Sequence, residues 1–355
     1  MLWHRAVTSV KPVITALLLA AAALGLSSAP ATAASRTQTH TQRAQVVFSP
    51  PQEGDKITLS ETSIGGPALW SLPDATPRVI LAWTGTDPAH HVNVSTGTDG
   101  FYYGAKRILP ETSPYRPAVT FSSGGRAGFI VVAWTGTDAA HTVNVEYLDA
   151  GTLATVRKLT FWGNSSTSAP GVAVYGAGEL AVSWTDSAQG INILRLSPQG
   201  QVLGQARLEQ LFASADTPNL SYDPGAGQLI LAKIEPAQFA SVLFFSTSTD
   251  AVQWTSERYI NETSAFSPSM VGIKAINMPT HWLAWTGTDA GHRLNVQYTE
   301  SFPDWANVNS KTTLGETAFG PPALGYMGTE RQMLVAWTGT DPAHHLNVAV
   351  VFVRS

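Results

Sequence analysis

Aspartate and histidine recur at a fixed spacing in this sequence, and their side chains can bind metal ions or hydrogen-bond to ligands. Four segments read Trp-Thr-Gly-Thr-Asp-x-x-His-x-x-Asn-Val, at residues 83–94, 134–145, 285–296 and 337–348. Each supplies a hydroxyl, a carboxylate and an imidazole. The candidate ligand-binding residues are therefore Thr86, Asp87, His90, Thr137, Asp138, His141, Thr288, Asp289, His292, Thr340, Asp341 and His344.

One interpretation is that these residues only shape a turn. The glycine allows backbone angles that other residues resist, and threonine and aspartate side chains can bond to nearby backbone amides. The histidine and asparagine could satisfy buried backbone groups between repeats.

A second interpretation is recognition of a sugar. Hydroxyls need paired donors and acceptors, while the C–H face of a sugar ring packs on aromatic surface. The chain has 11 Trp, 9 Tyr and 13 Phe, so aromatic residues are available.

A third interpretation is a metal site, because Asp87 and His90 stand three residues apart, as their counterparts do. Two ligands per turn leave a site half built, and the sequence offers no evident third ligand. We therefore predict no metal and no cofactor.

The repeat itself predicts the architecture. Two divergent copies, around Trp184 and Lys233, fill the gap between the four segments, which gives six units at steps of 49 to 52 residues. Within a unit, a short segment after a proline, an apolar run, an alternating run and a final run predict four antiparallel strands. Four-stranded sheets repeated about an axis make an all-β, six-bladed propeller.

The two ends of the chain are predicted to complete one blade together. The sixth unit runs out after its third strand, while residues 55–62 resemble the fourth strand at residues 106–112. We expect residues 56–60 to pair with the last strand, which would close the ring and remove open sheet edges.

Two repeated polar motifs are predicted to share one face of the propeller. In a meander, the turn between the second and third strands lies at the same end as the link from the fourth strand to the next blade. The Thr-Gly-Thr-Asp turns should therefore lie beside the Glu-Thr-Ser links, such as residues 61–63 and 262–264.

The N-terminus predicts export. Residues 1–34 combine basic residues, an apolar run and an Ala-Thr-Ala site, as a signal peptide does, and residues 35–45 read as a flexible linker to a single domain at 46–355. The apolar run is short for a membrane span. Loss of this leader would remove Arg5 and Lys11 and change the formal net charge from −4 to −6, which disfavours nucleic acid as a partner. The chain has no cysteine.

One hairpin resembles the Asp-box of bacterial sialidases. Residues 248–254 read Ser-Thr-Asp-Ala-Val-Gln-Trp, similar to the Ser-x-Asp-x-Gly-x-Thr-Trp hairpin that those six-bladed propellers repeat between third and fourth strands. The resemblance implies that the box is structural and lies opposite the ligand face.

The sialidase resemblance also implies catalytic candidates. Sialidases place three arginines around the substrate carboxylate, and the nearest match here is Tyr115 with Arg116; Arg293 and Arg331 are the other arginines considered. We could not assemble three convergent guanidiniums from the sequence. No Gly-x-Ser-x-Gly nucleophile elbow is present either.

The plan is also similar to that of six-bladed lectin propellers, whose sugar sites lie between blades. We therefore expect a secreted, non-catalytic propeller that binds carbohydrate or another surface polymer through repeated rim sites. The alternatives are a sialidase-like glycosidase with a central active site and a protein-interaction scaffold.

Overall fold

A computed structural model describes residues 56–71, 78–123, 128–208, 214, 216–236, 241–274, 280–299, 302–303, 311–328 and 332–352. The chain divides into two units, Met1–Arg43 and Ala44–Ser355, and all described residues belong to the second. The predicted signal peptide and linker lie outside the described residues. No helix among the described residues has the length and hydrophobicity needed to cross a membrane.

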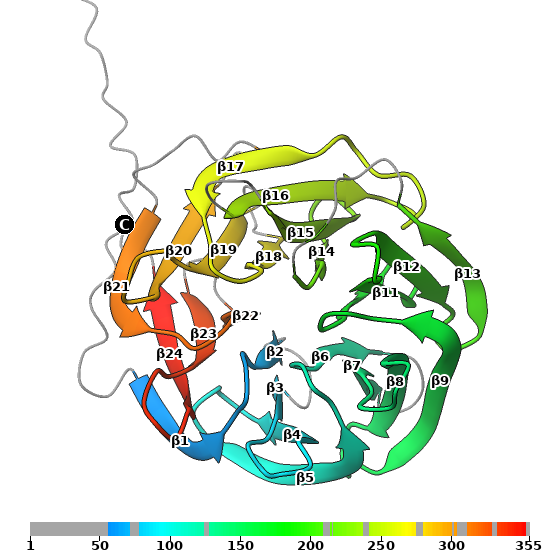
Figure 1. The fold of residues 1–355 in the computed structure, drawn as a ribbon, viewed down its shortest axis with the longest axis horizontal. Helices are drawn as coiled ribbons and strands as arrows, with labels where there is room; N and C mark the ends of the chain where they lie inside the picture. The colour runs from blue at the N-terminus through cyan, green and yellow to red at the C-terminus, as the bar shows by residue number, and fades with distance from the viewer. Residues whose placement is uncertain are drawn as a thin grey trace, which may run out of the picture. The chain divides into compact units, whose positions relative to one another are not determined.

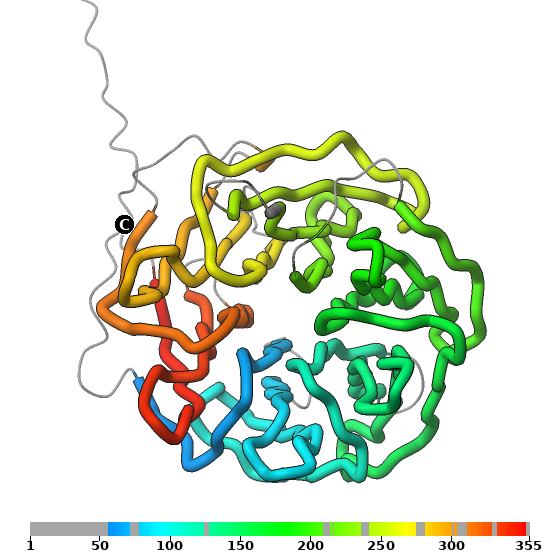
Figure 2. The backbone as a smooth tube through the Cα atoms, viewed as in Figure 1, coloured from blue at the N-terminus to red at the C-terminus, as the bar shows by residue number. Residues whose placement is uncertain are grey.

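Six four-stranded antiparallel sheets stand around a central axis, which confirms the predicted propeller (Figure 1). The backbone trace in Figure 2 shows the same ring of blades. The first three blades comprise β2 (Ala68–Ser71), β3 (Val79–Thr84), β4 (His91–Gly97) and β5 (Tyr103–Thr112); β6 (Ala118–Ser122), β7 (Phe129–Thr135), β8 (Thr142–Asp149) and β9 (Thr155–Ser165); and β10 (Gly171–Tyr175), β11 (Glu179–Thr185), β12 (Ile191–Leu196) and β13 (Val202–Arg207).

The remaining blades follow the same order from the axis outward. They comprise β14 (Asn219–Asp223), β15 (Gln228–Pro236), β16 (Ser241–Ser248) and β17 (Arg258–Thr263); β18 (Ser269–Ile273), β19 (Thr280–Thr286), β20 (Arg293–Thr299) and β21 (Lys311–Thr317); and β22 (Ala323–Tyr326), β23 (Gln332–Thr338), β24 (His345–Phe352) and β1 (Lys56–Thr62).

The outer strand of the sixth blade comes from the other end of the described chain. β1 pairs antiparallel with β24, with Lys56 opposite Ala349 and Thr58 opposite Asn347. The Thr58 hydroxyl donates to Oδ1 of Asn347 at 2.7 Å. The sixth blade is thus built from strands that are more than 260 residues apart in sequence.

The core lies between neighbouring blades. Each second strand is an apolar run buried on both faces, as in β3 and β7. Six clusters of buried apolar side chains form, one at each junction between blades. At the end of the second strand, five blades bury an equivalent tryptophan: Trp83, Trp134, Trp184, Trp285 and Trp337.

The fourth blade replaces this tryptophan with Lys233, whose Nζ lies 2.8 Å from Oε1 of the buried Glu257. Burial lowers the pKa of Lys233, while Glu257 opposes that shift. A second buried pair joins the fourth and fifth blades, where Nε2 of His281 lies 2.9 Å from Oδ2 of Asp223. The ring of Phe302 stacks on the imidazole of His281 at 4.0 Å.

Candidate functional site

The aspartate of each repeated turn binds the backbone of its own turn. In the first blade, Oδ1 of Asp87 accepts the Ala89 amide at 3.1 Å and Oδ2 accepts the His91 amide at 3.1 Å. Burial alone would raise the pKa of Asp87, but hydrogen bonds from His91 and Ala89 outweigh it and lower the pKa. Asp138, Asp289 and Asp341 hold their turns in the same way.

The threonine before this aspartate contacts the preceding blade. Its hydroxyl bonds to a threonine at the end of the preceding outer strand, at 2.5 to 2.8 Å. The pairs are Thr62 with Thr86, Thr112 with Thr137, Thr263 with Thr288, and Thr317 with Thr340. The turns and the links therefore lie on the same face of the propeller, which we call the link face.

The histidine of each turn adopts a left-handed backbone conformation. The φ angles of His90, His141, His292 and His344 are 57°, 50°, 49° and 58°. This conformation directs the histidine carbonyl to the link, where it accepts the backbone amide of the residue that follows the outer strand, at 3.0 Å. The acceptor and donor pairs are His90 with Ser113, His141 with Ser166, His292 with Ala318, and His344 with Ser63.

The third blade makes the same turn without a histidine. Gln189 has a φ of 62°, and its carbonyl accepts the Ser214 amide at 3.2 Å. The carboxylate of Asp186 also caps this turn, accepting the amides of Ala188 and Gly190 at 2.9 Å. The carboxylate is thus common to histidine-containing and histidine-free turns, whereas the imidazole is dispensable for the backbone geometry.

Two of the imidazoles lie against phenylalanines of the links. The ring centroids of His344 and Phe319 are 4.1 Å apart, and those of His292 and Phe266 are 6.3 Å apart. Phe319 is 45% exposed. Sequence reasoning missed these phenylalanines, although their position within two residues of the Glu-Thr-Ser or Glu-Thr-Ala triplet was a usable signal.

Two of the four aspartates also bond to the histidine that follows the motif histidine. Nδ1 of His91 lies 2.7 Å from Oδ1 of Asp87, and Nδ1 of His345 lies 2.7 Å from Oδ1 of Asp341. No group of three metal-binding side chains is found within the described ranges.

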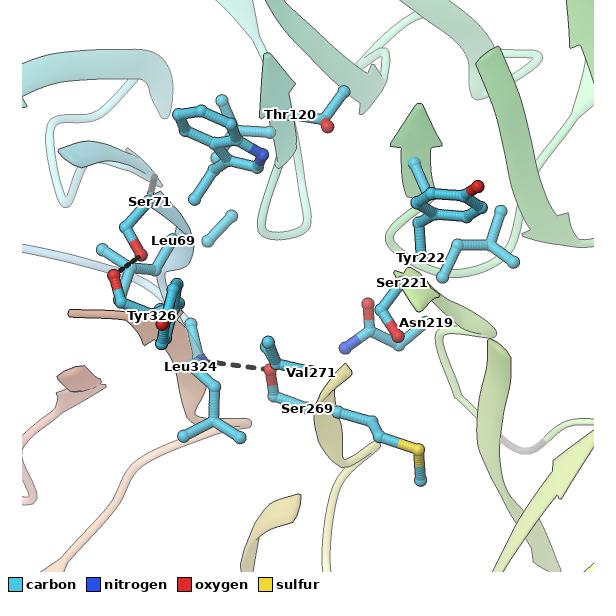
Figure 3. Close-up of a pocket in the computed structure, with 18 of the residues that line it drawn as sticks. Leu69, Ser71, Thr120, Asn219, Ser221, Tyr222, Ser269, Val271, Leu324 and Tyr326 are labelled. Atoms are coloured by element: carbon cyan, nitrogen blue, oxygen red, sulfur yellow. Dashed lines mark hydrogen bonds between the residues drawn. The ribbon is translucent and has the colours of Figure 1, made fainter. Parts of the chain in front are cut away.

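The two catalytic candidates lie at the mouth of the central channel on the link face. Tyr115 and Arg116 line a cavity of about 240 Å³ there, together with Asp216, Phe266 and Phe319. Arg116 also lines a second cavity of about 540 Å³ that runs along the inner strands (Figure 3). Arg116 therefore lies where the mouth meets the channel.

The Arg116 guanidinium is buried, and one of its nitrogens makes no hydrogen bond to the described residues. Arg116 is 7% exposed, and within the described part of the chain its Nε has no hydrogen-bond partner. Burial lowers the pKa of Arg116, and the charge of Asp216 opposes that shift. Of the other two arginines, Arg293 is the exposed first residue of β20, and Arg331 lies outside the described residues.

The hairpin at residues 248–254 is closed by its aspartate. Oδ1 of Asp250 accepts the amides of Val252 and Gln253 at 2.8 Å, and the Ser248 hydroxyl donates to it at 3.0 Å. Trp254 is buried beneath the hairpin. The hairpin joins third and fourth strands, at the end of the blade opposite the link face.

Comparison with known proteins shows similarity in fold without similarity in sequence. No protein-family model matches the sequence, and no curated protein is similar to it. Among solved structures, the chain is similar to an Aleuria aurantia lectin mutant in complex with α-methyl-L-fucoside, with a TM-score of 0.55 and 12% identity over 83% of this chain and 96% of the lectin.

Lectins and sialidases both occur among the similar structures. The BP39L lectin from Burkholderia pseudomallei has a TM-score of 0.55 and 13% identity over 84% of this chain and 81% of that lectin. The intramolecular trans-sialidase from Ruminococcus gnavus, in complex with oseltamivir carboxylate, has a TM-score of 0.56 and 9% identity over 83% of this chain and 96% of that enzyme. At these identities the likeness shows the fold alone.

Proposed function

We propose that this protein is an exported, non-catalytic propeller that binds carbohydrate on its link face through repeated rim sites. One observation carries the proposal: the imidazole of His344 lies 4.1 Å from the ring of Phe319, which is 45% exposed. An aromatic ring beside a hydrogen-bonding group suits a sugar, whose C–H face packs on the ring while its hydroxyls bond to polar atoms.

The histidine-free third blade supports a binding role for the imidazoles. Gln189 gives the same backbone angle and accepts the same hydrogen bond as the motif histidines, so the fold does not need an imidazole at this position. The aspartate and threonine side chains are engaged in turn and link contacts. His141 differs, because its Nδ1 lies 3.3 Å from the Gly136 carbonyl oxygen of its own turn. The part of the motif that remains for a ligand is therefore the imidazole in the other blades, with a link phenylalanine beside His292 and His344.

The arrangement of the rim sites favours a polymeric ligand. The blades with the full motif are the fifth, sixth, first and second, which are contiguous because β1 completes the sixth blade beside the first. Several weak sites along this arc, two of them with a phenylalanine beside the imidazole, would bind a repeating polysaccharide more tightly than a single sugar, because linked sites raise the effective concentration of each further contact.

The test is binding of the purified protein to a glycan array and to insoluble polysaccharides. Replacing His90, His141, His292 and His344 by asparagine removes the imidazoles and retains a residue that tolerates the left-handed conformation. We expect at least tenfold weaker binding to polymers and a nearly unchanged melting temperature. The matched control is Gln189→Asn, which should change neither quantity.

The aromatic part of the site has its own variant. Phe319→Ala should weaken binding, whereas Tyr259→Ala, which removes an exposed ring from the outer strand β17, should leave it unchanged. Undiminished glycan binding by the fourfold asparagine variant would remove the imidazoles from the site. Export is tested by expressing the full sequence in a secreting host and sequencing the N-terminus of the protein in the medium, which should begin near residue 35.

A further inference from the structure

The central channel holds a buried guanidinium that is near the charge of Asp216 but makes no ion pair with it. Only 7% of the surface of Arg116 is exposed to solvent, and within the described ranges its Nε lacks a hydrogen-bond partner. A buried unpaired charge costs free energy, so such a group is retained where it has a use other than stability.

The nearest acidic candidate at the mouth is engaged elsewhere. Oδ2 of Asp216 accepts the backbone amide of Ser267 at 2.9 Å, and Oδ1 accepts the Thr217 hydroxyl at 3.2 Å. The first bond ties the carboxylate to the link between the fourth and fifth blades, and the second ties it to its own link. The guanidinium of Arg116 therefore faces the cavity without a bonded counter-ion from Asp216.

Arg116 is not a requirement of the link. A proline stands directly before the inner strand of every blade. The residue before that proline differs in every blade and is Gly66, Arg116, Ala169, Thr217, Ser267 or Pro321. Five blades thus build an equivalent link without a cation, and the arginine breaks the symmetry of the ring.

Beyond Arg116 the channel wall is predominantly apolar. The second residue of every inner strand is aliphatic and lines the cavity: Leu69, Val119, Val172, Leu220, Met270 and Leu324. Aromatic residues follow near the strand ends away from the links, including Phe121, Tyr222 and Tyr326. Figure 3 shows Leu69, Tyr222 and Leu324 around this space. The polar side chains among the lining residues come from several blades and include Ser71, Thr120, Asn219, Ser221 and Ser269.

We propose that the channel binds an organic acid with an elongated apolar body, whose anionic group bonds to Arg116 and whose body extends along the inner strands. The cavity of about 540 Å³ falls within the size range of small-molecule sites. The six aliphatic side chains of the inner strands would exclude water from the body of the ligand. The low dielectric there would strengthen the bond between the guanidinium and the anion. This site is separate from the rim histidines.

The test uses 11-(dansylamino)undecanoate, a fluorescent acid, and its methyl ester as the uncharged counterpart. The full-length protein should bind one acid per chain and bind the ester at least tenfold more weakly, because the ester lacks the anion. Arg116→Met should weaken binding of the acid at least tenfold and leave binding of the ester unchanged. Arg116→Lys, which keeps the charge but not the fork of donors, should fall between.

The matched control is Lys274→Met, which removes another cation that lines the same cavity, at its far end. It should not change affinity for the acid. Arg116→Met should be at least as thermostable as the wild type, because it removes a buried charge that forms no hydrogen-bonded ion pair with Asp216. A lower melting temperature together with no binding of the acid by the wild type would show that Arg116 is structural and would overturn the proposal.

Three further outcomes would also overturn it. They are equal affinity for acid and ester, undiminished binding by Arg116→Met, and displacement of the probe by N-acetylneuraminate at lower concentration than by decanoate. Release of the chromophore from a chromogenic sialoside, lost in Arg116→Met, would replace the proposal with a glycosidase. The fourfold histidine variant should retain binding of the acid. The test of the channel therefore does not depend on whether the rim sites bind carbohydrate.

Discussion

Nζ of Lys106 lies 5.3 Å from the ring centroid of Trp83, over the face of that indole. The same ammonium lies 2.5 Å from Oε2 of Glu61, which belongs to the outer strand of the neighbouring blade. Each contact repeats in four blades: Lys56 with Trp337 and Glu316, Lys158 with Trp134 and Glu111, and Lys311 with Trp285 and Glu262. The lysine thus joins the core of its own blade to the link of the preceding one.

We expect Lys106→Met to lower the free energy of unfolding by about 1 kcal/mol. A partly exposed cation–π contact and a partly exposed ion pair each contribute about 0.5 to 1 kcal/mol. Urea denaturation of Lys106→Met, Glu61→Gln and the double variant measures the coupling between the two residues. A coupling near zero would show that the ion pair adds nothing.

The third blade supplies the control for this prediction. There a neutral amide pair takes the place of the ion pair, with Asn164 and Gln205 exchanging hydrogen bonds of 3.0 and 2.9 Å. Gln205→Met should have a smaller effect than Lys106→Met, and its effect should not depend on salt.

The buried pair of Asp223 and His281 predicts loss of stability in acid. Burial alone would raise the pKa of Asp223, but hydrogen bonds from His281, Ala226 and Gly225 outweigh it and lower the pKa below 3.8. The contribution of this carboxylate is therefore present above about pH 4 and is lost as pH falls through the lowered pKa. Asp223→Ala should cost about 3 kcal/mol at neutral pH, because it leaves His281 buried without its partner.

Thermal unfolding followed between pH 2 and pH 7 checks this prediction. The wild type should lose stability more steeply below pH 4 than Asp223→Ala does. Parallel pH profiles for the two proteins would contradict the assigned role of Asp223.

Repetition explains which parts of the fold were predictable. The strand order, the number of blades and the placement of turns and links on one face follow from residues that recur, such as Trp83 and Thr86. Every repeat packs against its neighbours in the same way, so the same residue types return at the same positions. The bulge in the outer strand was not predicted: the register of β5 shifts between Ile108 and Thr112, and Thr112 pairs with His91. A two-residue periodicity does not reveal such a bulge, because the bulge breaks the alternation.

Residues outside the repeat could not be placed from the sequence. Lys233 occupies a tryptophan position, and its partner Glu257 comes from a hairpin that no period links to it. Arg116 was noticed for its resemblance to a sialidase motif, but its burial between mouth and channel depends on how six links converge. The left-handed conformation of His90 also escaped notice, because histidine is not the residue that usually marks it.

The pairing of β1 with β24 predicts that the start of the propeller domain is needed for stability. Ile57 and Leu59 pack against the apolar cluster between the sixth and first blades. Deleting residues 1–60 should lower the free energy of unfolding by roughly 2 to 4 kcal/mol, from loss of this burial and of the strand pairing. It should also expose the edge of β24 and promote association.

Denaturant unfolding and static light scattering of this deletion check the prediction, with deletion of residues 1–54 as the control that leaves β1 intact. Equal stability and equal molecular mass for the two deletions would show that β1 is dispensable.

The link into the first blade passes so close to a neighbour that only glycine fits. A β-carbon at Gly66 would overlap the backbone oxygen of Pro321, and the Pro321 side chain closes the same space. Both residues line the mouth beside Phe319. We expect Gly66→Ala to cost about 2 kcal/mol or more, because backbone cannot yield as a flexible side chain does. Gly65→Ala is the matched control, since no atom lies within 4 Å of its β-carbon position. Thermal unfolding of the two variants decides the matter: equal melting temperatures would mean that the two links can separate at little cost.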